Sequence, residues 1–373
     1  MKIVADDKIP FLRGVFEPYA EVSYLPGSAI TQNDIAGADA LIVRTRTHCG
    51  AKLLDGSRVR MIATATIGFD HIDAAYCAAH GIEWANAPGC NAASVAQYIA
   101  SVLVRESLKR NMPLRGKTLG IIGVGHVGKL VAELGKTLGM TVLLNDPPRA
   151  EAEGGDDFLP LRQVCRESDF LTLHVPLTRD GAFRTVHLAN EDFFLACSRK
   201  PFFINASRGE TVSPDALTSA LLSRRIRGAA LDVWEDEPDI DTDLMALLDY
   251  ATPHIAGYSL DGKANGTAAA VRAVAGHFGI RELENFYPAA LPVPAQTLIE
   301  PSGDGTALAE AVLRAYDVLK DDARLRAEPQ LFERLRGDYP LRREFPAYTV
   351  SGGRNLSAAV LKQLSALGFA VER

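Results

Sequence analysis

Short apolar runs alternate with stretches of helical pattern along most of the chain. Within residues 1–90, five runs of this kind predict strands: KIVADD, EVSYLP, ALIVRT, VRMIATAT and IEWANAP. Strands that alternate with helices indicate a doubly wound α/β domain with a parallel sheet. Residues 92–110 keep an apolar helical face without Gly or Pro, and we expect one long connecting helix there.

The same alternation returns after this helix. The next predicted strands are TLGIIGVG, TVLLNDP, DFLTLHVP, FFINASRG and GAALDVW. They predict a second α/β unit that ends near His254. A return helix is expected over residues 264–286, where it would rejoin the first domain.

The remaining residues predict a small third unit. Residues 287–296, YPAALPVPAQ, are rich in proline and predict an extended linker. Leu308, Val312, Tyr316 and Leu319 fall on one face of a predicted helix, and residues 346–372 predict strand, helix and strand. So short a segment has a thin core, and we expect it to pack on another part of the protein or on a partner subunit.

Composition and charge narrow the possible functions. With 47% hydrophobic residues, 23% charged residues and a net charge of −6, the chain resembles an ordinary globular protein. The acidic balance argues against nucleic acid as a partner, and no apolar run is long enough to cross a bilayer, so we expect a cytoplasmic protein without membrane contact. The cysteines show no CxxC spacing, so neither a disulfide framework nor a metal site is predicted.

A glycine-rich turn after the first strand of the second unit predicts a dinucleotide site. Gly123, Gly125 and Gly128 form the pattern G-x-G-x-x-G between an apolar strand and a helix. The amides of His126 and Val127 would face the pyrophosphate. Asp146, at the end of the next strand, would bind the adenosine ribose and favour NAD over NADP, although Arg149 follows closely. The alternative is that the glycines only permit close packing and that Asp146 is a surface turn residue.

Three polar residues follow predicted strands of the second unit. They are Arg208 in INASRGE, an acid of DVWEDEP and His254 in TPHIAGY, and spacing alone does not choose among Glu235, Asp236 and Glu237. In open α/β folds ligands bind at the carboxyl ends of the strands, so the three side chains are expected to meet there. Taken singly, each has a structural alternative: a strand-end cap, a solvated turn or a buried histidine. Taken together behind a dinucleotide site, they favour catalysis.

These residues carry a resemblance to the D-2-hydroxyacid dehydrogenase family, to which ATATIGFDHID, NAPGCNAASVAQY, LHVPLT and NASRG are also similar. The resemblance implies that His254 takes the proton of the C2 hydroxyl while C2 gives a hydride to NAD. It implies that Arg208 binds the substrate carboxylate and that Glu237, the acid before Pro238, orients the imidazole. The further cofactor contacts that it implies are Val175, Ala206, Ser207, Arg208, Asp232 and Gly257.

Substrate contacts are expected from the first domain. Thr66 and Thr45 offer hydroxyls near strand ends, and Tyr258 follows the histidine loop. Arg44 and Arg46 would lie on one face of a strand and could bind a phosphate. Strand-end threonines, solvated arginines and a core tyrosine are the alternatives.

The resemblance and the patterns together predict α/β architecture: two doubly wound parallel-sheet (Rossmann-like) domains and a small C-terminal α+β dimerisation domain. The predicted boundaries are residues 1–93 with 258–285 for a flavodoxin-like substrate-binding domain, 94–257 for the NAD-binding domain and 286–373 for the dimerisation domain. The expected function is oxidation of a phosphorylated 2-hydroxy acid by a homodimer. Another member of the family, such as a 3-phosphoglycerate dehydrogenase, and an NAD-sensing binding protein are the alternatives.

Overall fold

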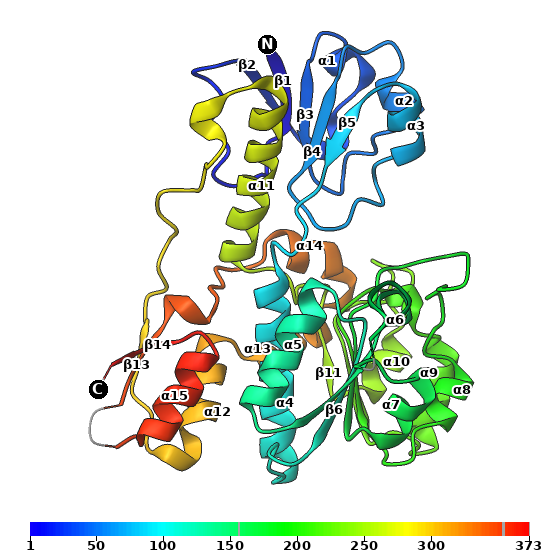
Figure 1. Ribbon diagram of the computed structural model, residues 1–373, viewed down its shortest axis with the longest axis vertical. Coiled ribbons are helices and arrows are strands. Elements are labelled where there is room, and N and C mark those ends of the chain that lie inside the picture. The colour runs from blue at the N-terminus through cyan, green and yellow to red at the C-terminus, as the bar shows by residue number, and fades with distance from the viewer. Residues whose placement is uncertain (156, 353–354, 373) are drawn as a thin grey trace. The chain divides into compact units, whose positions relative to one another are not determined.

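The computed structural model describes residues 1–155, 157–352 and 355–372. The chain forms two compact units, one of Met1–Asn91 with Ser259–Pro292 and one of Ala92–Tyr258 with Val293–Arg373. Each unit contains a parallel sheet with helices on both faces (Figure 1). The predicted Rossmann-like α/β fold class is therefore confirmed.

The sheet of the first unit has five strands in the order β2-β1-β3-β4-β5. Helix α11 (Leu260–Phe278) covers one face, and the short helices α1 (Gln32–Ile35), α2 (Ala51–Leu54) and α3 (Ala74–Ala79) lie on the other (Figure 1). The strands are β1 (Lys2–Asp6), β2 (Glu21–Leu25), β3 (Ala40–Val43), β4 (Met61–Thr64) and β5 (Glu83–Ala85). All five were expected from the sequence.

Strand alternation divides the core of this unit into two layers. Ile3 of β1 is buried in one cluster with Val271 of α11, whereas its neighbour Val4 is buried in another with Ile35 of α1. Because both faces are covered, the inner strands β3 and β4 are buried along their whole length, which is the pattern expected of a parallel sheet, whereas the edge strands β2 and β5 are partly exposed.

Helix α11 differs from its predicted bounds at both ends. It begins at Leu260 because the Ser259 side chain accepts a hydrogen bond from the amide of Gly262, and it ends at Phe278 because Gly279 adopts a left-handed conformation with φ of 71°. The prediction of one helix to residue 286 was therefore wrong beyond residue 278.

The sheet of the second unit has six strands in the order β11-β10-β9-β8-β6-β7. Helices α4 (Ala92–Arg110) and α5 (His126–Thr137) lie on one face, and α7 (Leu161–Glu167), α8 (Glu191–Leu195) and α9 (Pro214–Leu222) lie on the other (Figure 1). The strands are β6 (Thr118–Ile122), β7 (Thr141–Asn145), β8 (Phe170–Leu173), β9 (Phe202–Asn205), β10 (Gly228–Leu231) and β11 (Tyr250–Ala251). Because the strand order reverses between β6 and β8, a ligand crevice is expected at their carboxyl ends.

The C-terminal segment packs as part of the second unit. Its three-stranded sheet has the order β12-β13-β14. The elements are β12 (Leu298–Ile299), α12 (Asp304–Ala315), α13 (Val318–Ala327), α14 (Phe332–Gly337), β13 (Thr349–Ser351), α15 (Ala358–Ala366) and β14 (Ala370–Glu372). Val312 and Val350 are buried in the same cluster as Leu103 of α4, which explains how so small a segment is stabilised.

One helix of this segment was predicted wrongly. Helix α12 ends at Ala315, Tyr316 is extended with φ of −153°, and α13 starts anew after Asp317, whose carboxylate caps it by accepting a hydrogen bond from the amide of Leu319. Tyr316 and Leu319 therefore do not continue the helical face of Leu308. By contrast, the predicted strand, helix and strand near the C-terminus are present as β13, α15 and β14.

Two features bear on the expected class of protein. Among the residues that the structure describes, no helix is both long and apolar enough to cross a membrane. The same residues contain no group of three or more His, Cys, Asp and Glu side chains that could hold a metal ion. None of the five cysteines, all of which the structure describes, forms a disulfide bond.

Candidate active site

In the glycine turn between β6 and α5, a side chain would fit at Gly125 but would collide with other atoms at Gly123 and Gly128. Gly123 has φ of 86°, and a Cβ built there would lie 2.6 Å from the carbonyl oxygen of His174 and 2.9 Å from Cγ1 of Val175. A Cβ on Gly128 would lie 2.1 Å from the carbonyl oxygen of Gly123, whereas a Cβ on Gly125 would meet no atom within 4 Å. Close packing therefore requires glycine at 123 and 128, while Gly125 faces open space.

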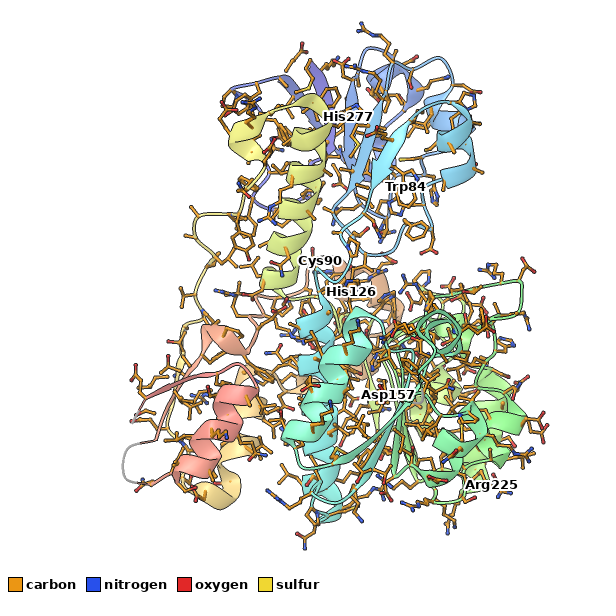
Figure 2. All side chains as sticks on the ribbon, in the orientation of Figure 1. Trp84, Cys90, His126, Asp157, Arg225 and His277 are labelled. Atoms are coloured by element: carbon orange, nitrogen blue, oxygen red, sulfur yellow. The ribbon has the colours of Figure 1, made fainter. Side chains whose placement is uncertain are left out.

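The first turn of α5 offers an anion site at this open position. Figure 2 labels His126, the first residue of the helix, which is exposed as Gly125 is. The amides of His126 and Val127 belong to the first turn, where no intrahelical acceptor is available to them. The space above Gly125, which a side chain would fill, and these amides fit a dinucleotide pyrophosphate.

Asp146 shapes the same turn from the end of β7. Its carboxylate accepts hydrogen bonds from the amide of Val124 at 2.8 Å and from the amide of Arg149 at 3.1 Å. Arg149 forms an ion pair with Glu153 at 2.7 Å, and its guanidinium lies 5.0 Å from the ring centroid of Phe158. The charge of Arg149 is thus balanced by Glu153, and the acidic Asp146 lies at the end of β7, the position from which a preference for NAD over NADP was predicted.

The different surroundings of the glycines give a matched pair of substitutions. Gly125→Ala should fold with an unchanged Tm but bind NAD about 10-fold or more weakly, because the new methyl group occupies the space of the pyrophosphate. Gly128→Ala should lower the Tm, because its methyl group collides with the backbone of Gly123. Thermal unfolding and calorimetric titration with NAD check both. Unchanged NAD affinity in Gly125→Ala would contradict the assigned site.

Three neighbouring strands carry the three predicted catalytic residues at their carboxyl ends. Arg208 follows β9, Glu237 follows β10 and His254 follows β11, and the sheet order makes these strands adjacent. The loops after β9 and β10 touch, since a Cβ on Gly209 would lie 1.9 Å from the carbonyl oxygen of Trp234. The structure therefore brings the three loops to one edge of the sheet.

Glu237 and His254 form the central pair of this edge. The imidazole Nδ1 of His254 lies 2.7 Å from Oε2 of Glu237, and the other carboxylate oxygen accepts a hydrogen bond of 2.9 Å from the amide of Trp234. Burial opposes the charge of Glu237, but the hydrogen bond and charge of His254, the Trp234 amide and the charge of Arg336 together lower its pKa. An ionised carboxylate only accepts hydrogen bonds, so Nδ1 carries the proton of this contact, and Nε2 is the ring nitrogen left to exchange a proton with a ligand.

The backbone of His254 is held in an unusual conformation. Its φ is 55°, which is uncommon for a residue with a side chain and is found where the surroundings enforce it. Its amide donates a 2.7 Å hydrogen bond to the carbonyl oxygen of Asp232. The buried Asp232 carboxylate accepts hydrogen bonds from the amides of Ile255 and Ala256, both at 2.8 Å, and from the Thr252 hydroxyl. Asp232, predicted as a cofactor contact, thus shapes the loop that carries His254.

Arg208 is half-buried in the loop after β9. Its guanidinium Nη1 donates a 2.9 Å hydrogen bond to the carbonyl oxygen of Ser207. The buried Asn205 side chain fixes this loop by accepting from the amide of Ser207 and donating to the carbonyl oxygen of Arg208, at 3.0 Å and 2.9 Å. Ala206, Ser207 and Arg208 therefore have a defined backbone.

Several residues that support the pair were missed from the sequence. The Trp234 indole donates a 3.0 Å hydrogen bond to the carbonyl oxygen of Thr252, and the Tyr98 hydroxyl lies 3.0 Å from the Thr252 hydroxyl. Arg336 lies with its guanidinium 5.6 Å from the ring centroid of Tyr258, the residue that follows Gly257. No local pattern marks them, because each acts through a partner distant in the sequence.

The substrate candidates of the first unit lie in loops after strands. Strand β3 ends at Val43, and the amide of Thr47 bonds to the carbonyl oxygen of Arg44, so Thr45 and Arg46 stand exposed in a turn. The prediction that strand alternation places Arg44 and Arg46 on one face was therefore wrong. Arg44 pairs with the buried Asp6 through hydrogen bonds of 3.0 and 3.1 Å.

Thr66 and Lys263 of the first unit have polar and charged neighbours, respectively. The Thr66 hydroxyl donates a 2.9 Å hydrogen bond to the carbonyl oxygen of Gly68 and lies 2.8 Å from the Thr64 hydroxyl. Burial, and then the charge of Arg44, lower the pKa of Lys263. Lys263 and the Arg44–Asp6 pair therefore lie within electrostatic range of each other.

Comparison with known proteins identifies the family. Residues 93–256 match the model of the NAD-binding domain of D-isomer specific 2-hydroxyacid dehydrogenases, and residues 291–368 match a domain of unknown function (DUF3410). The chain is 49% identical to the erythronate-4-phosphate dehydrogenase of Bacteroides thetaiotaomicron, with 94% of this chain and 99% of that protein covered. It is 41% identical to the enzyme of the same name from Edwardsiella ictaluri, with 99% of each covered. The chain belongs to the erythronate-4-phosphate dehydrogenase family.

Membership of this family confirms the predicted resemblance to D-2-hydroxyacid dehydrogenases and the prediction of an NAD-dependent dehydrogenase. The sequence already favoured this branch of the family, because TPHIAGYSLDGKANGT and the length of the C-terminal tail resemble erythronate-4-phosphate dehydrogenases.

Solved structures agree with the fold. The D-lactate dehydrogenase of Aquifex aeolicus, complexed with NAD and lactic acid, aligns with a TM-score of 0.59 and 26% identity over 78% of this chain and all (100%) of that one. The NAD+-bound 3-phosphoglycerate dehydrogenase of Entamoeba histolytica aligns with a TM-score of 0.64 and 24% identity, covering 76% of this chain and 97% of that one.

A second histidine near the glycine turn gives a pH prediction. Burial lowers the pKa of His174 to about 3, and its buried Nδ1 has no hydrogen-bond partner in the structure. In the folded protein His174 stays neutral, whereas in the unfolded chain it is protonated below its ordinary pKa of ~6.5. His174 therefore lowers the free energy of unfolding progressively as the pH falls below ~6.5. Its contribution to the slope is about 1.4 kcal/mol per pH unit.

Imidazole NMR tests this prediction directly. The ring signals of His174, assigned by comparison with His174→Asn, should stay those of a neutral imidazole from about pH 7 to about pH 5. A titration of these signals with a midpoint near pH ~6.5 would show that the side chain is accessible to water.

Proposed function

We propose that this protein oxidises 4-phospho-D-erythronate to 2-oxo-3-hydroxy-4-phosphobutanoate with NAD, as a step in the biosynthesis of pyridoxal 5′-phosphate. The observation that carries the chemistry is the 2.7 Å hydrogen bond between His254 and Glu237 at the carboxyl edge of an NAD-binding sheet. The relatives that cover nearly the whole chain, named erythronate-4-phosphate dehydrogenase, support the substrate.

His254 is the general base of the proposed reaction. Its Nε2 accepts the proton of the C2 hydroxyl as C2 loses its hydride, for which NAD, when bound, is the acceptor. Glu237 holds the imidazole in the required tautomer through Nδ1 and stabilises the positive charge that develops on it. In the reverse direction, the imidazolium returns the proton to the substrate oxygen.

Arg208 binds and orients the substrate in this proposal. A planar guanidinium can donate two parallel hydrogen bonds to the C1 carboxylate, which fixes C2 relative to the base. NAD would be held by the following residues: Gly123, Gly125, His126, Val127, Gly128, Asp146, Val175, Ala206, Ser207, Arg208, Asp232 and Gly257. The open space at Gly125 and the amides of the first turn of α5 support the pyrophosphate position.

The substrate phosphate is the group that would distinguish this substrate from unphosphorylated 2-hydroxy acids. We assign it to Arg44, Arg46 and Lys263, and the remaining substrate contacts to Thr45, Thr66 and Tyr258. The half-buried position of Lys263 near Arg44 supports this, because Asp6 is the carboxylate that pairs with Arg44 and a phosphate would supply a counter-charge to Lys263.

Lys263→Met is expected to raise the KM for 4-phospho-D-erythronate about 10-fold, because one charge-assisted contact with the phosphate is lost. The KM for unphosphorylated D-erythronate should change less than about twofold. Steady-state kinetics with both acids make the comparison, and Lys52→Met, which alters an exposed lysine of α2, is the matched control. An equal change in KM for both acids would show that Lys263 does not bind the substrate phosphate.

We further propose that residues 1–93 with 258–285 form the substrate-binding domain, 94–257 the NAD-binding domain and 286–373 a dimerisation domain of a cytoplasmic homodimer. The exposed apolar side chains of Val293, Leu298 and Leu341 support a subunit contact in the C-terminal segment. Sedimentation equilibrium tests the subunit number.

The enzymatic proposal is tested by measuring NADH formation with a panel of acids. 4-Phospho-D-erythronate should give a kcat/KM at least about 10-fold above those of 3-phosphoglycerate, D-lactate and unphosphorylated D-erythronate. NADH formation with another member of the panel alone would reject the proposed substrate, and no turnover with any acid would favour a binding protein.

A further inference from the structure

A buried arginine of the C-terminal segment contacts the loop that carries His254. Arg342 is 5% exposed and lies within the residues that match the domain of unknown function. Its Nη1 donates hydrogen bonds of 3.2 Å to the carbonyl oxygens of Ile255 and Ala256, the two residues after His254. The C-terminal segment therefore reaches the catalytic loop through its backbone.

The same two residues are held from the opposite side by Asp232. Its carboxylate accepts hydrogen bonds of 2.8 Å from the amides of Ile255 and Ala256, whose carbonyls are the acceptors of Arg342. Both residues are buried, with exposed fractions of 0% and 1%. Without Arg342, these carbonyl oxygens would lose a buried charged donor, which favours rearrangement of the loop.

Arg342 is itself fixed on helix α4. Its Nε donates a 2.8 Å hydrogen bond to Oε1 of Gln97, and its Nη2 donates one of 2.6 Å to the carbonyl oxygen of Ser94. The guanidinium lies 3.7 Å from the ring centroid of Tyr316. A planar side chain held at three points and by stacking can transmit the position of α4 to the loop, which a flexible lysine would do less well.

The conformation of His254 makes this support consequential. The residue has φ of 55°, a conformation that the surrounding contacts must maintain, and its Nδ1 must remain within 2.7 Å of Glu237. A displacement of about 1 Å in an active site can lower the rate about 100-fold.

We propose that Arg342 is a positioning residue for the proposed base His254. Arg342 binds the carbonyl oxygens of Ile255 and Ala256 while Asp232 binds their amides, and together they hold the loop so that the imidazole of His254 stays hydrogen-bonded to Glu237. This inference rests on the proposed role of His254 in catalysis. The C-terminal segment would then help to position the proposed base of the same chain.

The test compares Arg342→Met and Arg342→Lys with a matched control, Arg326→Met. Arg326 also belongs to the C-terminal segment and donates hydrogen bonds of 2.9 Å to two backbone carbonyls, those of Met245 and Leu248, but these lie outside the His254 loop. We expect Arg342→Met to lower kcat about 10- to 100-fold while the Kd for NAD changes less than about threefold. The kcat of Arg342→Lys should lie between those of Arg342→Met and the wild type. The kcat of Arg326→Met should stay within about twofold of the wild-type value even if its Tm is lowered.

NMR of the His254 imidazole separates positioning from general stability and from the proposed reaction. The Nδ1 proton signal, assigned with His254→Gln, should be present in wild type and Arg326→Met and weakened or lost in Arg342→Met and Arg342→Lys. Wild-type kcat together with an unchanged Nδ1 signal in the Arg342 variants would overturn the inference. If Arg342→Met does not fold, Arg342→Lys alone decides by the same two readouts. If the wild type shows no turnover, the proposed reaction fails, and the NMR comparison still decides whether Arg342 positions His254.

Discussion

Replacing His254 with alanine is expected to lower kcat about 10³- to 10⁴-fold while NAD still binds. The substitution removes the Nε2 that takes the hydroxyl proton, and general base catalysis contributes rate factors of about this size. It leaves the glycine turn and the amides of α5 intact, because the loop after β11 is a different segment of the chain. The measurements are steady-state kcat and calorimetric titration with NAD.

His187 provides a matched control for this substitution. Its Nε2 lies 3.0 Å from Oε1 of Glu235, and its φ of 49° resembles that of His254, so it too is a histidine paired with a glutamate in a left-handed conformation. We expect His187→Ala to keep kcat within about threefold, because the mechanism requires no base there. A similar loss of rate in both variants, or an unfolded His254→Ala protein, would return His254 to a structural role.

Replacing Arg208 with methionine is expected to lower kcat/KM about 10²- to 10³-fold. The guanidinium is the proposed partner of the C1 carboxylate, and truncating one partner of such a charged pair costs about 2 to 5 kcal/mol. Arg208→Lys should retain an intermediate activity, because a single ammonium keeps the charge but cannot form two parallel hydrogen bonds. The Kd for NAD should change little in the lysine variant.

Steady-state kinetics with 4-phospho-D-erythronate check both Arg208 variants. Arg179→Lys is the control, since Arg179 lies 3.4 Å from Glu210 on the neighbouring surface and is exposed. Equal kcat/KM for wild type and Arg208→Met would exclude a role in binding the carboxylate.

The parts of the fold that the sequence predicted well are those that local patterns determine. Each strand of the two large sheets was expected, β11 only as the strand before TPHIAGY, because short apolar runs bounded by turns and helices are typical of buried parallel strands. Helix α4 was predicted with the bounds that the structure has, since no Gly or Pro interrupts it and its apolar face is continuous. The placing of Arg208, Glu237 and His254 at one edge of the second sheet was also expected, because parallel strands have their carboxyl ends at the same edge.

The errors occurred where one residue ends an element against the general pattern. Gly279 ends α11 and Asp317 begins α13 anew, although the apolar periodicity continues past both. In the turn after Val43, the pairing of Arg44 with the buried Asp6 outweighs the alternation expected of a strand. At Gly279 and Asp317 a local capping residue outweighs the apolar periodicity. The Arg44–Asp6 pair is a tertiary contact, which a local pattern does not contain.

The support of the candidate active site was beyond sequence reasoning for the same physical cause. Glu237 and His254 could be proposed from their places after strands, but the side chains of Trp234, Asp232 and Arg342 act on backbone atoms of other segments. Any residue type offers a backbone carbonyl or amide, so the sequence does not mark the acceptors.

The most direct test of the central claim follows the hydrogen on C2. Wild-type protein is mixed with NAD and 4-phospho-D-erythronate deuterated at C2, and mass spectrometry then analyses the reduced cofactor and the acid. The account predicts that one deuterium enters each reduced cofactor and that a 2-oxo acid forms in equal amount. It also predicts that the His254→Ala variant forms the labelled cofactor and the 2-oxo acid at a far lower rate. Absence of label in the reduced cofactor, while another C2-deuterated 2-hydroxy acid transfers its deuterium efficiently, would contradict the account.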